Sequence, residues 1–106
     1  MSISARYRQI LDQIEGEIDK LYEELPETTA TALRAADMAV EELQDWVEAV
    51  GEIPQYMLEN KLAPVLLKVH EHLDRARVLL EKGEHKHAAG QIWEHEQMIY
   101  RLLNDL

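Results

Sequence analysis

The sequence has no cysteine, and its only serines are Ser2 and Ser4. Without cysteine the chain cannot form a disulfide framework, a thiolate zinc site, an iron–sulfur cluster or a thiol nucleophile. The two serines lie where a frayed chain end is expected, and neither a glycine-rich phosphate loop nor a nucleophile–base pair is recognisable. We therefore expect no enzyme activity and no bound cofactor.

Long apolar runs are also missing. No stretch approaches the ~18 apolar residues that a membrane-spanning helix needs. The N-terminus becomes amphipathic at once instead of forming the apolar segment of a signal peptide. The absence of cysteine also fits a reducing compartment. These features predict a cytoplasmic protein that does not bind membranes.

Positive charge is scarce, because 11 basic residues stand against 21 acidic ones and the net charge is −10. DNA and RNA repel such a chain, and no basic stripe offsets the repulsion, so we expect no nucleic-acid partner. An acidic surface favours solubility and a basic protein partner. The five histidines all fall in the second half of the chain, which is the less acidic one.

The chain does contain four stretches of similar length in which apolar residues recur every three or four positions, as in amphipathic helices. They cover residues 3–25, 29–50, 62–80 and 88–106. They are separated by Pro26, residues 51–54 and Gly83. Short connections make successive helices antiparallel neighbours. The sequence therefore predicts an all-α, up-and-down antiparallel four-helix bundle, with residues 1–106 as a single domain.

A few residues disturb this regular pattern. Gly16 lies inside the first helix, where glycine costs about 1 kcal/mol relative to alanine, so we expect a close helix crossing there. Pro64 lies inside the third helix, where it removes the hydrogen bond to the Asn60 carbonyl and predicts a kink or a break. Thr28 or Thr29 is expected to cap the second helix.

One short segment has a family resemblance. The stretch from Ala76 to Ala88, with Leu79, Leu80 and Gly83 between them, resembles the helical hairpins of tetratricopeptide and HEPN-type domains. It occurs once, whereas a tetratricopeptide array needs about three repeats to bury its core. The resemblance implies a helical hairpin and no particular function.

The histidines are the candidate metal ligands. His95 falls on the core-facing stripe of the fourth helix, and His72 flanks the stripe of the third at a similar level. His85 and His87 could bind one ion beside Glu84 if that turn is irregular. A di-iron site is not expected, since it needs several inward glutamates and two Glu-x-x-His elements. The competing interpretation is a hydrogen-bonded His95 and exposed side chains for the others.

Four of the six aromatic residues fall toward one end of the predicted bundle, namely Tyr7, Trp46, Tyr56 and Tyr100. Tyrosine and tryptophan combine apolar area with a polar tip and are enriched at protein interfaces. These residues predict a docking surface at that end. A cap over the core of a single chain would use the same residue types.

Acidic stripes follow the first two helices, and they comprise Asp12, Glu15, Asp19 and Glu23, then Asp37, Glu41, Asp45 and Glu48. Such stripes are usually solvated faces, but they could also bind a basic partner helix. The third helix could supply that partner surface in a second subunit, through Lys61, Lys68, Arg75 and Arg77.

On these grounds we expect a non-enzymatic helical bundle that self-associates as a homodimer and acts through protein–protein contacts, since two-fold dimers are the commonest assemblies. The alternative is a metal- or small-ligand-binding bundle that uses histidines of the C-terminal half. Its candidate ligands are His72, His85, His87 and His95, with Glu84 beside them.

Overall fold

The computed structural model describes residues 1–106 and is built from helices alone. The four long helices are α1 (Ile3–Glu24), α2 (Ala30–Val50), α3 (Leu58–Lys82) and α4 (Lys86–Asn104). Short 3-10 turns precede α2 and α3, at η1 (Glu27–Thr29) and η2 (Gln55–Met57). The predicted all-α four-helix bundle is confirmed.

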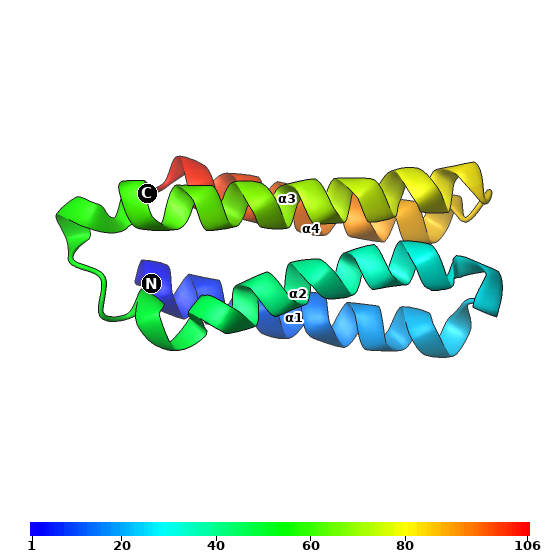
Figure 1. Cartoon of the computed structure of the whole chain (residues 1–106), viewed down its shortest axis with the longest axis horizontal. Coiled ribbons are helices and arrows are strands. Elements are labelled where there is room, and N and C mark those ends of the chain that lie inside the picture. Colours follow the sequence, from blue (N-terminus) through cyan, green and yellow to red (C-terminus); the bar gives the residue numbers. More distant parts are fainter.

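The helices run alternately up and down, and each packs against the helices beside it (Figure 1). The α1–α2 and α3–α4 turns lie at one end of the bundle, while both termini and the α2–α3 connection lie at the other. The bundle measures 43 × 20 × 20 Å. Packing is closest between α2 and α3 and between α3 and α4, and it is least close between α1 and α4.

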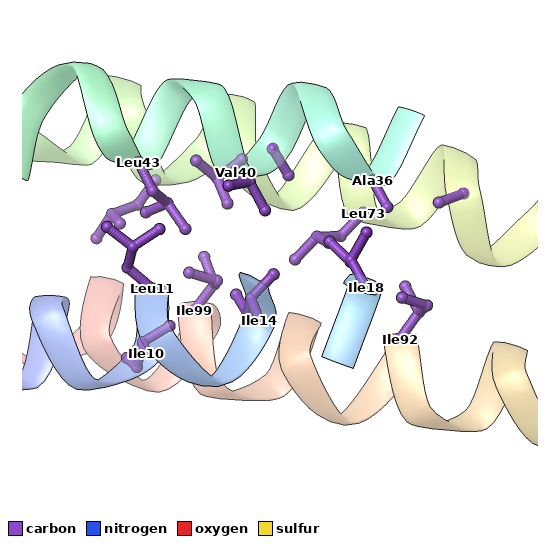
Figure 2. Packing of buried hydrophobic residues seen from close by; sticks show 14 of the residues in the cluster. Ile10, Leu11, Ile14, Ile18, Ala36, Val40, Leu43, Leu73, Ile92 and Ile99 are labelled. Carbon is purple, nitrogen blue, oxygen red and sulfur yellow. The ribbon is translucent and has the colours of Figure 1, made fainter. Parts of the chain in front are cut away.

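The core is one continuous cluster of 27 buried hydrophobic residues drawn from all four helices. In Figure 2, Ile14 of α1, Leu43 of α2, Leu73 of α3 and Ile99 of α4 project into the space that the ribbons enclose. Each fully buried aliphatic side chain contributes about 1.5–3 kcal/mol. The apolar spacing that predicted the helices therefore also identifies the faces that meet inside the bundle.

The first two helices begin differently. Ser2 caps α1, because its hydroxyl oxygen accepts a hydrogen bond from the Ala5 amide at 3.1 Å. Thr29 precedes α2 as expected, but its side chain makes no capping bond. Its hydroxyl instead donates to the Pro26 carbonyl at 2.7 Å, which fastens the η1 turn.

The α3–α4 turn has a left-handed residue, and it is Glu84, with φ 66°. The amide of His85 donates to the Leu80 carbonyl at 2.8 Å, and the Glu84 amide donates to Glu81 at 3.0 Å. These bonds are the pattern that ends many helices, in which glycine usually takes the left-handed position. Gly83 closes α3 after Lys82 as expected, but with φ −82° it is the C-cap, and the left-handed position falls on the next residue.

Pro64 does not break α3, which continues from Leu58 to Lys82. Pro64 and Asn60 are both exposed, so water can reach the Asn60 carbonyl that lacks its helical partner. A break is therefore unnecessary at this position.

The expected close crossing at Gly16 is wrong. A Cβ placed on Gly16 would meet nothing within 4 Å. No neighbouring helix therefore requires glycine here, and the residue weakens α1 without a packing benefit in this chain.

None of the four helices combines the length and apolar character that crossing a membrane requires.

Candidate functional site

The five predicted metal ligands lie in three different settings. His85 is half-buried immediately before α4, with Glu84 and His87 exposed on either side of it. His72 is half-buried on α3, and His95 packs inside the bundle on α4. No group of three or more histidine, cysteine, aspartate or glutamate side chains is arranged to hold a metal ion.

His95 faces inward, as its place on the apolar stripe predicts. Its side chain is 12% exposed, and both ring nitrogens are buried without a hydrogen-bond partner. The nearest carboxylate oxygen, of Glu17 on α1, lies 3.9 Å from Nε2. Burial lowers the pKa of His95, although the charges of Glu17 and Glu94 oppose this effect. The ring is therefore held neutral between α1 and α4.

A polar cluster that the sequence did not predict joins α3 to α4 around Arg77. The Arg77 guanidinium donates to Asp74 at 2.6 Å, to Glu81 at 2.8 Å and to Glu96 at 3.1 Å. Glu96 comes from α4 and is only 2% exposed. The imidazole of His70 lies 3.8 Å from the other Glu96 oxygen. All three guanidinium nitrogens thus have carboxylate partners within the chain.

The electrostatics of this cluster centre on Glu96. Burial, followed by a hydrogen bond and repulsion from Asp74, raises the pKa of Glu96 to about 7, and Arg77 only partly opposes this. Hydrogen bonding from Arg77 lowers the pKa of Asp74. Glu96 therefore exchanges a proton near neutral pH, while Asp74 and Arg77 stay charged.

These contacts remove part of the basic surface expected on α3. Arg77 is held by three carboxylates, and Lys68 pairs with Glu42 of α2 at 3.1 Å. Arg77 and Lys68 therefore already have carboxylate partners within the chain, and binding of this surface to the acidic stripe of a second subunit stays a prediction. Arg75 and Lys61 remain exposed.

The four predicted interface aromatics differ strongly in exposure. Tyr7 is fully buried, and its hydroxyl donates to the Leu43 carbonyl. Burial, with the charges of Asp45 and Glu42, raises the pKa of this phenol. Trp46 is half-buried against the core, whereas Tyr56 is 84% exposed and Tyr100 is 51% exposed. Docking through these residues stays a prediction. Among the four, Tyr56 and Tyr100 are the exposed side chains.

Further apolar side chains are exposed on the outer side of α3 and α4, a surface named here the α3–α4 face. Trp93 is 51% exposed, and Leu67 of α3 is 57% exposed. Trp93 and Tyr100 are two turns apart on one side of α4. That side adjoins α3, because the Tyr100 ring lies 6.3 Å from the ring of His70. Leu67 lies one turn from His70, so all three apolar residues share this face.

A groove crosses the α3–α4 face near the α3–α4 turn, with a volume of about 460 Å³. It is lined by Arg77, Glu81, Lys86, Ala89, Gly90 and Trp93. The apolar spacing of α4 does not predict this groove, since glycine counts as neither apolar nor polar in such a pattern. The only signal in the sequence was a glycine inside a helix, one turn before a tryptophan.

The opposite side of the bundle is acidic. A groove of about 250 Å³ between α1 and α2 is lined by Glu15, Ile18, Asp19, Asp37, Val40, Glu41 and Gln44. Residues of both predicted acidic stripes thus meet at one surface. Gln44 donates to Glu15, so part of this charge is already hydrogen-bonded within the chain.

Comparisons with known proteins found no match to this chain among protein-family models, curated proteins or solved structures.

Proposed function

We propose that this protein is a non-enzymatic helical bundle of the cytoplasm that self-associates as a homodimer and acts through protein–protein contacts. The observation that carries the proposal is the exposure of Leu67, Trp93 and Tyr100 on the α3–α4 face. Large apolar side chains exposed on one face favour association, because burying them removes apolar area from water. Tryptophan and tyrosine are also among the residues that contribute most to interfaces.

The charge distribution favours this face over the opposite one. Two copies that met through the α1–α2 groove would bring Glu15, Asp19, Asp37 and Glu41 of each chain together and repel one another. The α3–α4 face carries both signs of charge, and its carboxylates Asp74, Glu81 and Glu96 are paired with Arg77. A dimer through α3 and α4 also leaves the acidic surface free for the basic protein partner that the composition favours.

The size of the bundle supports a stable dimer. Its long sides measure about 43 by 20 Å. A standard interface buries about 800 Å² on each partner, and the area of one long side is of that order.

We also propose that the protein catalyses no reaction. Arg77 and Glu96, whose pKa values are both raised, pair with one another across α3 and α4. Such a network is a reasonable structural link between two helices, since buried charges need partners.

Sedimentation equilibrium of the untagged protein over a wide concentration range tests self-association. We expect a dimer that dissociates on dilution and contains no stoichiometric metal. Trp93→Asp should weaken this dimer, whereas Met38→Asp, which introduces the same charge at an exposed apolar residue of α2, should not.

A concentration-independent monomer would contradict the proposal. A monomer carrying one metal ion per chain would favour the alternative of a metal-binding bundle, for which the unpartnered nitrogens of His95 are the one supporting observation. Equal weakening by both aspartate variants would show that the contact is not confined to the α3–α4 face.

A further inference from the structure

Gly90 has no role that the single chain explains. It lies inside α4, where glycine is less favourable than every residue except proline. A Cβ added to Gly90 would meet nothing within 4 Å, so no neighbouring helix needs the space. Glycine inside a helix otherwise permits the close approach of another molecule.

The surroundings of Gly90 form a hollow beside a projecting ring. Gly90 and Ala89 lie in the floor of the α3–α4 groove, and Trp93 borders it one turn further along α4. No atom of the Trp93 ring lies within 4 Å of the position that a Gly90 Cβ would take. The indole is half-exposed, so it projects from the surface without filling the hollow beside it.

We propose that a second copy of this chain docks in this groove, with Trp93 of each copy seated over Gly90 of the other. This inference rests on the proposed self-association and specifies the surface that carries it. A two-fold axis generates both contacts, because when Trp93 of the first copy meets Gly90 of the second, Trp93 of the second copy also meets Gly90 of the first.

The spacing along α4 suits that symmetry. Gly90 and Trp93 are three residues apart, so about 4.5 Å of helix rise separates them on the same side of α4. Two antiparallel copies of α4 that cross midway between these residues therefore bring each indole to the level of the other copy's glycine. The groove of about 460 Å³ gives the ring space to enter.

Charge complementarity supports the same arrangement. Lys86 borders the groove toward the start of α4, and Glu94 follows Trp93 on its other side; both are exposed. In the antiparallel crossing, Lys86 of one copy and Glu94 of the other differ in level by about one helical turn. Long side chains span that separation, and the pair occurs twice in the dimer.

Gly16 provides a matched control. It is also an exposed glycine inside a helix, and a Cβ there also meets nothing within 4 Å. It lies on α1, away from the α3–α4 face, among acidic neighbours such as Asp12 and Asp19. A leucine at either glycine favours the helix, but only a leucine at Gly90 fills the proposed docking hollow.

The test compares wild-type protein with Gly90→Leu, Trp93→Ala and Gly16→Leu by sedimentation equilibrium. We expect Gly90→Leu and Trp93→Ala to raise the dimer Kd by about tenfold or more, as loss of a central tryptophan contact does, and Gly16→Leu to leave it unchanged. Thermal unfolding of the monomer, followed by circular dichroism at a concentration below the Kd, should show a higher Tm for both leucine variants. A more stable fold with weaker association excludes misfolding as the cause.

Two results would overturn the inference, and they are distinguishable. A wild-type dimer whose Kd is unchanged by Gly90→Leu places the contact elsewhere and leaves the proposed function standing. A wild-type monomer at every concentration removes both the proposed function and this docking arrangement.

Discussion

At the scale of single residues, Glu84 occupies a backbone conformation that suits glycine better. Its φ of 66° lies in the left-handed region, which costs an L-residue with a Cβ about 1–2 kcal/mol. The hydrogen bonds from Glu84 and His85 to α3 hold the residue there. The α3–α4 turn is therefore fixed by those bonds, and its sequence is not optimal for it.

Glu84→Gly should consequently stabilise the fold, by about 1 kcal/mol. Urea denaturation of the variant and the wild type measures the difference. Lys82→Gly is the control, because this substitution lies in the last turn of α3 and should lower the unfolding free energy by about 0.5–1 kcal/mol. Destabilisation by both substitutions would mean that the turn is not left-handed at residue 84.

A second prediction for a single residue concerns the buried carboxyl of Glu96, whose pKa is raised to about 7 from an ordinary value of 4.5. The folded state thus holds this proton more tightly than the unfolded state does. The resulting stabilisation is complete below about pH 4.5 and is lost as the pH rises toward 7. The change amounts to about 3 kcal/mol at most.

Glu96→Gln stays neutral and should not show this loss. Its amide can still accept a hydrogen bond from Arg77 and donate one to Asp74. Denaturation of both proteins between pH 4.5 and 7.5 gives the comparison, in which contributions shared by the two proteins, such as that of His95, cancel. Parallel pH profiles would show that Glu96 does not titrate in this range.

At the scale of the element, α3 is continuous although it contains Pro64. The proline removes one backbone hydrogen bond, and the exposed position lets water partly replace it. The helix survives because Leu62, Leu66 and Val69, on either side of the proline, are fully buried. Tertiary packing thus outweighs the local preference of the chain.

Pro64→Ala should restore the bond to the Asn60 carbonyl and raise the unfolding free energy by about 1–3 kcal/mol. Pro54→Ala is a suitable comparison, since Pro54 precedes the η2 turn and interrupts no helix. It should leave stability unchanged or lower it slightly, because proline restricts the unfolded chain. Chemical denaturation of both variants checks the difference, and equal effects would contradict this account of Pro64.

At the scale of the whole molecule, the sequence predicted the architecture well because the apolar spacing depends only on helix geometry. Residues such as Ile14, Leu43 and Ile99 lie in the core as their spacing indicates. Pro26 and Gly83 marked the ends of helices for the same local reasons. These features need no knowledge of which helices meet.

The Arg77 cluster and the Gly90 groove could not be predicted from the sequence, because both depend on how α3 and α4 are rotated about their axes relative to one another. A glutamate reads as exposed in a pattern, yet Glu96 faces Arg77 nineteen positions away and is buried. Similarly, Gly16 and Gly90 are indistinguishable in the sequence, and only Gly90 has an exposed tryptophan beside a groove. Whether the predicted metal ligands and the predicted interface aromatics come together depends on the same helix rotations.

The four seams between neighbouring helices differ, and the seam between α1 and α4 is the least closely packed. Local opening of a folded protein begins where the fewest contacts must be broken. Transient separation of α1 from α4 therefore costs less than separation of α3 from either of its neighbours. Such an opening brings water to the unpartnered ring of His95 and lets it take up a proton. The protonated ring cannot be reburied without paying for its desolvation, so acid should prolong the lifetime of the open state.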